Sequence, residues 1–138
     1  MSTVRKFEDF ECWQLARKMD KELFPLTKQN GFERDFKLKD QILGSSGSIM
    51  DNISEGFGRR TNADFCRFLS YSHGSCDEIK SQLYRALDRA YINQAEFKSL
   101  YDQATVIAKK VGSLMSHLDS SGYKPDFNKR GDQALTEY

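Results

Sequence analysis

Three residues with the potential for chemistry, His73, Cys76 and Asp77, lie close together in this sequence. Their i, i+3 and i+4 spacing would place them on one helix, as metal ligands or as a cysteine nucleophile beside a histidine base. One helix supplies too few ligands for a tetrahedral zinc shell, and the other histidine, His117, lies far along the chain. The sequence also lacks the Glu-x-x-His pairs of di-iron bundles and any evident oxyanion group. We therefore expect no catalytic residue, no metal site, no cofactor and no enzymatic activity.

A second candidate is the segment Gly56-Phe57-Gly58, which resembles half of a phosphate-binding loop. Phosphate loops of this kind follow a β-strand, and no strand pattern precedes these residues. We interpret the two glycines as a helix stop, with Gly58 as a left-handed C-cap.

Basic residues follow this stop and recur later in the chain. The tentative nucleic-acid-binding set is Arg59, Arg60, Arg67, Lys109 and Lys110, which Arg85 and Arg89 could extend. The chain carries 21 basic and 20 acidic residues, so any binding to phosphates must depend on a local patch. A solvated surface of mixed charge, interrupted by Asp64, Asp77 and Asp88, is the alternative.

Four polar residues fall on otherwise apolar helix faces: Asn52, Glu55, Glu78 and Gln82. Buried polar groups without partners cost about 1–3 kcal/mol each, so inward-facing members must be hydrogen-bonded. We interpret them as a structural network that links the second and third helices and holds the turn at Gly56. A ligand or partner site is the alternative.

Apolar residues recur at helical spacing over most of the 138 residues, with only two prolines, Pro25 and Pro125. The pattern predicts four helices, over about Phe7 to Lys28, Phe36 to Phe57, Thr61 or Asn62 to Ala90, and Asn93 or Gln94 to Ser121. The fold class is therefore all-α, an antiparallel up-down-up-down four-helix bundle. We expect the bundle to occupy residues 1–121, Gly122 to cap the last helix, and residues 122–138 to be a mostly disordered tail.

Small residues occupy the middles of the second and third helices, at Gly44–Ser48 and Ser72–Ser75. Small side chains let two helices approach closely, so we expect these helices to be in closest contact there. Replacing Gly74 with Leu would then overpack the contact.

Three cysteines, Cys12, Cys66 and Cys76, form no CxxC pair, and their odd number argues against a secreted disulfide framework. The sequence shows no signal peptide and no apolar run long enough for a membrane span. We expect a soluble, cytoplasmic protein that does not enter a membrane.

Several segments agree in order and spacing with a known family. They are Phe7-Glu8-Asp9 followed by Trp13 and Ala16, Gln41-Ile42, Ser48-Ile49-x-x-Asn52-Ile53-x-Glu55-Gly56-Phe57, Phe65-x-x-Phe68-Leu69, Gly74-Ser75-x-x-Glu78 and Gln82-Leu83. From about Phe7 to Leu118 the chain resembles the four-helix-bundle protein family, also called the 23S rRNA intervening-sequence protein. Some members are encoded in inserts within bacterial ribosomal RNA genes.

The resemblance implies a non-enzymatic protein that assembles into a homopentamer and, by analogy with the related accessory protein of diversity-generating retroelements, associates with nucleic acid. A protein-interaction scaffold that binds a protein partner and no RNA or DNA is the alternative. The chain departs from the family pattern of two arginines and two alanines after Gln-Ile, because it has Leu43-Gly44-Ser45-Ser46 there. Serine also stands in place of the usual alanine at Ser54 and Ser72.

Overall fold

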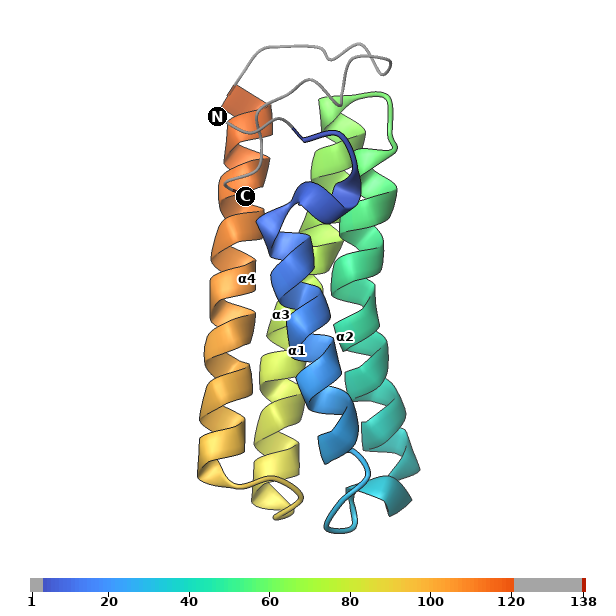
Figure 1. Cartoon of the computed structure of the whole chain (residues 1–138), viewed down its shortest axis with the longest axis vertical. Coiled ribbons are helices and arrows are strands. Elements are labelled where there is room, and N and C mark those ends of the chain that lie inside the picture. Colours follow the sequence, from blue (N-terminus) through green and yellow to red (C-terminus); the bar gives the residue numbers. More distant parts are fainter. Residues whose placement is uncertain (1–3, 121–137) are drawn as a thin grey trace.

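The computed structural model describes residues 4–120 and Tyr138, and long helices make up most of this part of the chain (Figure 1). The elements are η1 (Phe7–Asp9), α1 (Glu11–Leu26), η2 (Phe32–Arg34), α2 (Phe36–Phe57), α3 (Asn62–Asp88) and α4 (Gln94–Ser120). Within these residues there are four α-helices and no strand, which confirms the predicted all-α, four-helix class. No segment of the described helices has the sustained apolar character that a membrane-spanning helix requires.

The four helices form one bundle in which α1 packs against α2 and α4, and α3 packs against the same two helices. The most extensive contact is between α2 and α3. Consecutive helices are joined by short connections at alternate ends of the molecule (Figure 1). These contacts are consistent with the predicted antiparallel order. The predicted cap at Gly122 and almost all of the predicted tail, residues 122–138, lie outside the described residues.

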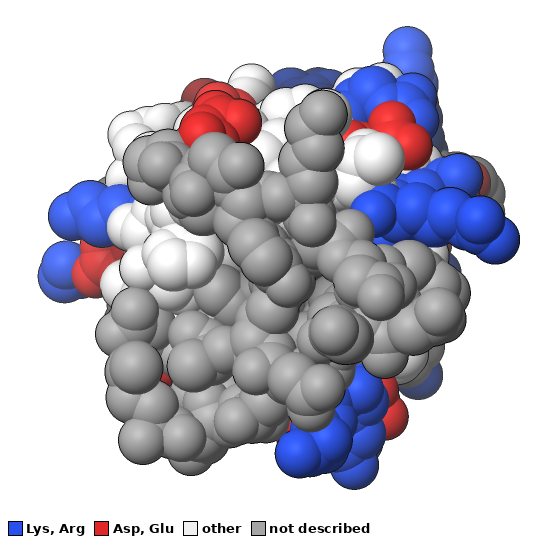
Figure 2. Space-filling model, turned by 90° about the horizontal axis from the view of Figure 1, so that it is seen from above, with Lys and Arg blue, Asp and Glu red and all other residues white. Residues whose placement is uncertain are grey.

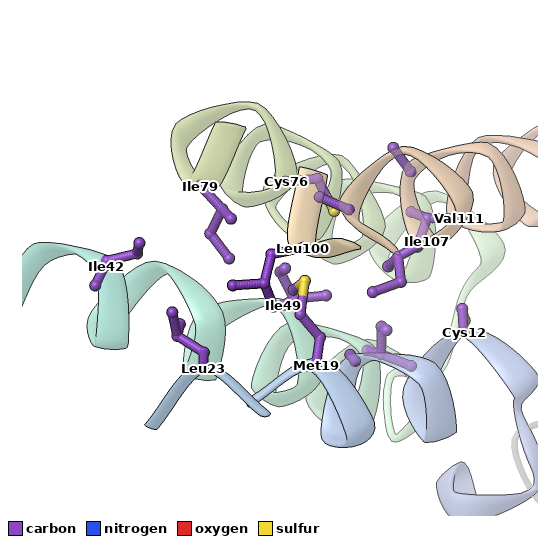
Figure 3. Close-up of a cluster of buried hydrophobic side chains, with 14 of the residues drawn as sticks. Cys12, Met19, Leu23, Ile42, Ile49, Cys76, Ile79, Leu100, Ile107 and Val111 are labelled. Carbon is purple, nitrogen blue, oxygen red and sulfur yellow. The ribbon is translucent and has the colours of Figure 1, made fainter. Parts of the chain in front are cut away.

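Apolar side chains from all four helices meet along the axis of the bundle. Figure 3 shows Met19 and Leu23 of α1, Ile42 and Ile49 of α2, Cys76 and Ile79 of α3, and Leu100, Ile107 and Val111 of α4 pointing toward one another. All of these side chains are buried. Removing this apolar surface from water is the main force that holds the helices together.

The first helix begins later than predicted, because Phe7–Asp9 form a separate 3₁₀ turn and Phe10 is extended (φ −69°, ψ 128°). The extended backbone directs the Phe10 ring into the core, where its centroid lies 5.3 Å from that of Phe57 and 5.8 Å from that of Phe65. Pro25 stands in the last turn of α1, and the helix ends one residue later, as a proline so placed predicts.

Two loops meet at the end of the bundle where α1 is connected to α2. Asn30 and Gly31 have left-handed backbone angles (φ 57° and 92°) in the turn between α1 and α2. Asp35 caps α2 by accepting a hydrogen bond from the Leu38 amide, and its other oxygen accepts bonds from Arg89 (2.7 Å) and the Tyr91 hydroxyl (2.9 Å). A single carboxylate therefore holds the α1–α2 connection against the α3–α4 connection.

The other helix ends are mostly those that the sequence predicts. Thr61 caps α3 by accepting from the Asp64 amide, and Asn93 accepts from the Glu96 amide at the start of α4. The left-handed C-cap predicted at Gly58 is wrong. Gly58 keeps right-handed helical angles (φ −77°, ψ −5°), because its amide donates to the Glu55 carbonyl and the Arg59 amide donates to the Gly56 carbonyl, which continues the helical turn.

Among the glycines of α2 and α3, Gly56 lies against the neighbouring helix, and the three predicted glycines do not. A Cβ atom built on Gly56 would lie 2.9 Å from both Phe65 Cδ1 and Phe68 Cβ. A Cβ atom on Gly44, Gly47 or Gly74 would meet nothing within 4 Å. The expectation that Gly74→Leu overpacks the contact is therefore wrong, because Gly74 faces open space.

Candidate functional site

The connection between α2 and α3 brings two of the predicted basic residues together on one aromatic ring. The guanidinium carbon of Arg59 lies 4.5 Å from the centroid of the Phe68 ring, and that of Arg67 lies 5.0 Å from it. Both distances are within the range of cation–π attraction. Arg60, between α2 and α3, is exposed. We call Arg59, Arg60, Arg67, Phe68 and Tyr71 the arginine–aromatic patch.

Tyr71 extends this patch by one helical turn. Tyr71 is 49% exposed, and its ring centroid lies 5.9 Å from that of Phe68 in an edge-to-face contact. An exposed ring beside guanidinium groups is the combination on which nucleic-acid bases stack while cations contact the phosphates.

Each of the two arginines on Phe68 also has an acidic neighbour. Arg59 Nη2 lies 2.9 Å from Glu55 Oε1, and Arg67 Nη2 lies 3.4 Å from Asp64 Oδ1. Both pairs are well exposed, so solvent screens them and each contributes little to stability. A phosphate that binds these guanidinium groups would compete with the carboxylates.

Lys109 and Lys110 lie on α4, apart from this patch. Lys110 Nζ is 3.2 Å from Glu11 Oε2 of α1, and both lysines border a hollow of about 380 Å³ with Ser113 and Tyr138. The predicted basic set is therefore divided between two places. Seen from the end where α2 is connected to α3, Lys and Arg lie at several separate places around the edge, some beside Asp or Glu (Figure 2).

The predicted polar set is also divided. Gln82 is buried and its Nε2 donates to Ser45 Oγ of α2 at 3.0 Å, whereas Asn52 Nδ2 donates to the carbonyl and hydroxyl oxygens of Ser48 within α2. Glu55 is exposed and pairs with Arg59, and Glu78 is exposed. The two carboxylates thus lie on the surface, where hydration removes the need for a buried partner.

Serines supply further hydrogen bonds between α2 and α3. Ser75 Oγ donates to Ser48 Oγ at 3.0 Å, and the buried Ser72 Oγ donates to the Ile49 carbonyl at 2.8 Å. The sequence pattern marks these serines only as small residues. A serine on an inward-facing helix position must bond to something, and that requirement is the signal that could have identified them.

The cysteine with the potential for chemistry, Cys76, is buried in the core. Burial raises the pKa of the Cys76 thiol to about 12, so the thiol is protonated at neutral pH. A protonated thiol is a weak nucleophile and a weak metal ligand. Within the described residues, no group of three or more His, Cys, Asp or Glu side chains is arranged to hold a metal ion.

A sequence model of the 23S rRNA-intervening sequence protein family matches residues 8–113, which is most of the chain. The chain belongs to this family. The family match agrees with the resemblance that the sequence motifs carry, and it covers the arginine–aromatic patch and all but the last residues of α4.

A solved structure with the same fold is a protein of unknown function from the S23 ribosomal protein family of Bacteroides thetaiotaomicron VPI-5482. It is 25% identical to this member of the 23S rRNA-intervening sequence protein family, with a TM-score of 0.70. The similarity covers 75% of this chain and 97% of that one. No protein with a curated description matches the chain.

Of the positions at which this family member departs from the expected pattern, Leu43 to Ser46 and Ser54 lie on α2, and Ser72 lies on α3. Gly44 is exposed and faces open space, while Ser45 bonds to Gln82 and Ser46 Oγ donates to Asp20 of α1 at 2.9 Å. The two serines therefore link α2 to the helices on either side of it.

Proposed function

We propose that this protein is a non-enzymatic accessory protein that binds RNA or DNA as a homo-oligomer, with Arg59, Arg60 and Arg67 contacting phosphates. We further propose that each subunit is an antiparallel up-down-up-down bundle, that five subunits form the oligomer, and that it acts in the cytoplasm. The family to which the chain belongs supports this choice of class. The single observation that carries the proposal is the placement of two guanidinium groups against one ring, Phe68.

The geometry suits phosphate contacts because the guanidinium groups are already positioned. Contact with Phe68 restricts the side chains of Arg59 and Arg67, so less conformational entropy is lost when a phosphate binds. The half-exposed Tyr71 ring offers a surface for an unpaired base. We therefore expect single strands to bind more tightly than duplexes of the same length.

A single chain would bind weakly. Its net charge is only +1, and Glu55 and Asp64 already pair with two of the arginines. In a ring of subunits the same patch is repeated around the axis, and several weak contacts to one strand give a much higher combined affinity. Oligomerisation is thus part of the proposed binding mechanism.

The proposal is tested by fluorescence anisotropy of labelled single-stranded and duplex RNA and DNA with the wild-type oligomer in low salt. We expect binding with little sequence preference, and a Tyr71→Ala variant that loses affinity for single strands while its affinity for duplexes changes less. Absence of binding to every probe in low salt would contradict the proposal.

A protein-interaction scaffold is the second candidate, and one surface between α1 and α4 favours it. A hollow of about 210 Å³ there is bordered by Leu15 and by Val106, which is 44% exposed. Exposed apolar surface of this kind occurs at protein-binding sites. Capture of partners from native cells with and without nuclease distinguishes the candidates, because nuclease removes nucleic-acid-mediated partners and leaves direct protein partners.

A further inference from the structure

A second hollow, separate from the arginine–aromatic patch, lies between α2 and α3. It has a volume of about 530 Å³, within the size range of small-molecule sites, and it is open to solvent. Much of its lining is small, with Gly44 and Ser48 from α2 and Ser75 from α3. A Cβ atom on Gly44 would meet nothing within 4 Å, so there is room for a ligand beside the backbone of α2.

Gln82, one of the residues that line this hollow, has a buried oxygen that lacks a hydrogen-bond partner in the described part of the chain. Gln82 is only 6% exposed, and its Nε2 donates to Ser45 Oγ, but its Oε1 accepts no hydrogen bond. An unpaired buried acceptor is unfavourable, so a donor from outside the chain is expected to complete it. The group that the hollow lacks is therefore an N–H or O–H donor.

The charges around the hollow determine the kind of donor. Asp40 and Glu78 contribute two carboxylates, and Arg85, which donates to Gln41 Oε1 at 3.1 Å, contributes one guanidinium group. The carboxylates outnumber the cation, so a phosphate or other anion is disfavoured and a cation is favoured. A metal ion does not fit, because the described residues contain no group of three suitable ligands.

We propose that this hollow binds a small aliphatic amine or guanidine, whose N–H groups donate to Gln82 Oε1 and whose positive charge faces Asp40 and Glu78. Such a ligand donates a hydrogen bond to the unpaired oxygen of Gln82 and brings a positive charge next to the two carboxylates. The site does not depend on the proposed nucleic-acid function, because it lies on a different part of the α2–α3 surface and has the opposite charge preference.

The test is isothermal titration calorimetry of the full-length protein with agmatine and putrescine at concentrations up to about 1 mM. The matched ligand control is putrescine with both nitrogens fully methylated, because it carries the same two positive charges and has no N–H donor. We expect agmatine and putrescine to bind and the methylated putrescine to bind at least about tenfold more weakly.

Three variants locate the site. Gln82→Leu removes the acceptor and Glu78→Gln removes one charge, and each should weaken binding by about tenfold. Asp102→Asn, which removes an exposed carboxylate from α4, is the matched control and should leave the affinity within about twofold. Glu78 is exposed, so its variant should fold normally, and circular dichroism checks that Gln82→Leu does too.

Three results would overturn the proposal. The first is no binding of either amine. The second is equal binding of the fully methylated putrescine, which would indicate that charge alone holds the ligand. The third is an equal loss of affinity in Asp102→Asn and Glu78→Gln, which would place the amine on the general acidic surface.

Discussion

At the α2–α3 connection, two arginine side chains contact one aromatic ring. Arg59 and Arg67 reach the Phe68 ring from different elements, one from the connection after α2 and the other from α3 itself. Phe68 is almost buried, so it provides a fixed surface on which both guanidinium groups are held near solvent. Phe68 therefore both packs within the bundle and orients two cations at its surface.

The backbone of Gly56 lies directly against Phe65 and Phe68 of α3, and a pair of alanine variants tests this packing. Gly56→Ala would place a methyl group 2.9 Å from Phe65 and Phe68, so we expect a loss of about 1–3 kcal/mol in the free energy of unfolding. Gly74→Ala adds the same methyl group to open space and should gain up to about 1 kcal/mol from helix propensity. Urea unfolding measures both, and equal stability of the two variants would contradict the assigned packing.

At the scale of the elements, the sequence predicts the four helices and their connections. It predicts less reliably which face each helix turns toward its neighbours. The predicted bounds of α2, Phe36 to Phe57, are those observed, because the apolar period and the glycines that follow it are local signals. The Thr61 cap is local in the same way. The early start predicted for α1 is wrong because Phe10 takes an extended backbone in order to bury its ring against α2 and α3.

The candidate site was less predictable, because it depends on which side chains of separate elements meet in the folded chain. Arg59, Arg60 and Arg67 stand out in the sequence as basic residues, but their relation to Phe68 depends on the path of the chain between α2 and α3. Lys109 and Lys110 lie in a different hollow, which no local pattern indicates. The open face of Gly74 and the closed one of Gly56 likewise depend on which side of each helix faces its neighbour.

Asp35 connects two loops, and its titration should be visible in the stability of the bundle. The hydrogen bond from Tyr91, followed by those from Leu38 and Arg89, lowers the pKa of this carboxyl from its usual value of 3.8. The folded state therefore favours the carboxylate, so its stabilisation is fully present above about pH 4 and is lost as the pH falls through the lowered pKa.

Asp35→Asn should remove this pH dependence while retaining a capping oxygen for α2. We expect the variant to be about 1 kcal/mol less stable than the wild type at pH 7, with the difference shrinking at low pH. Thermal unfolding between about pH 3 and pH 7 measures it, with Asp102→Asn as an exposed carboxylate control. A constant difference across this range would show that the charge of Asp35 is not what stabilises the loops.

At the scale of the whole molecule, the described chain is one bundle with a mixed-charge surface and several exposed aromatic and apolar side chains. The largest exposed fractions are those of Phe36 (70%) and Tyr84 (51%). Subunit association would cover such residues, and we propose a pentamer. Light scattering coupled to gel filtration should give about five times the chain mass of 15.9 kDa, and that chain mass itself at micromolar concentration would contradict the pentamer.

The central claim is that Arg59 and Arg60 bind nucleic-acid phosphates, and the salt dependence of binding tests it most directly. The affinity of the protein for a single-stranded RNA is measured between about 50 and 200 mM salt for three proteins. They are the wild type, Arg59→Ala with Arg60→Ala, and Lys18→Ala with Lys98→Ala. The lysine variant is the control. It removes the same two positive charges, from exposed i,i+4 ion pairs elsewhere on the bundle.

We expect the arginine variant to bind all sequences more weakly. Its slope of log affinity against log salt should be flatter by about 0.7 for each phosphate that the variant no longer neutralises, while the lysine variant should follow the wild type. Equal slopes for the arginine and lysine variants, or a salt-independent affinity of the wild type, would contradict the claim.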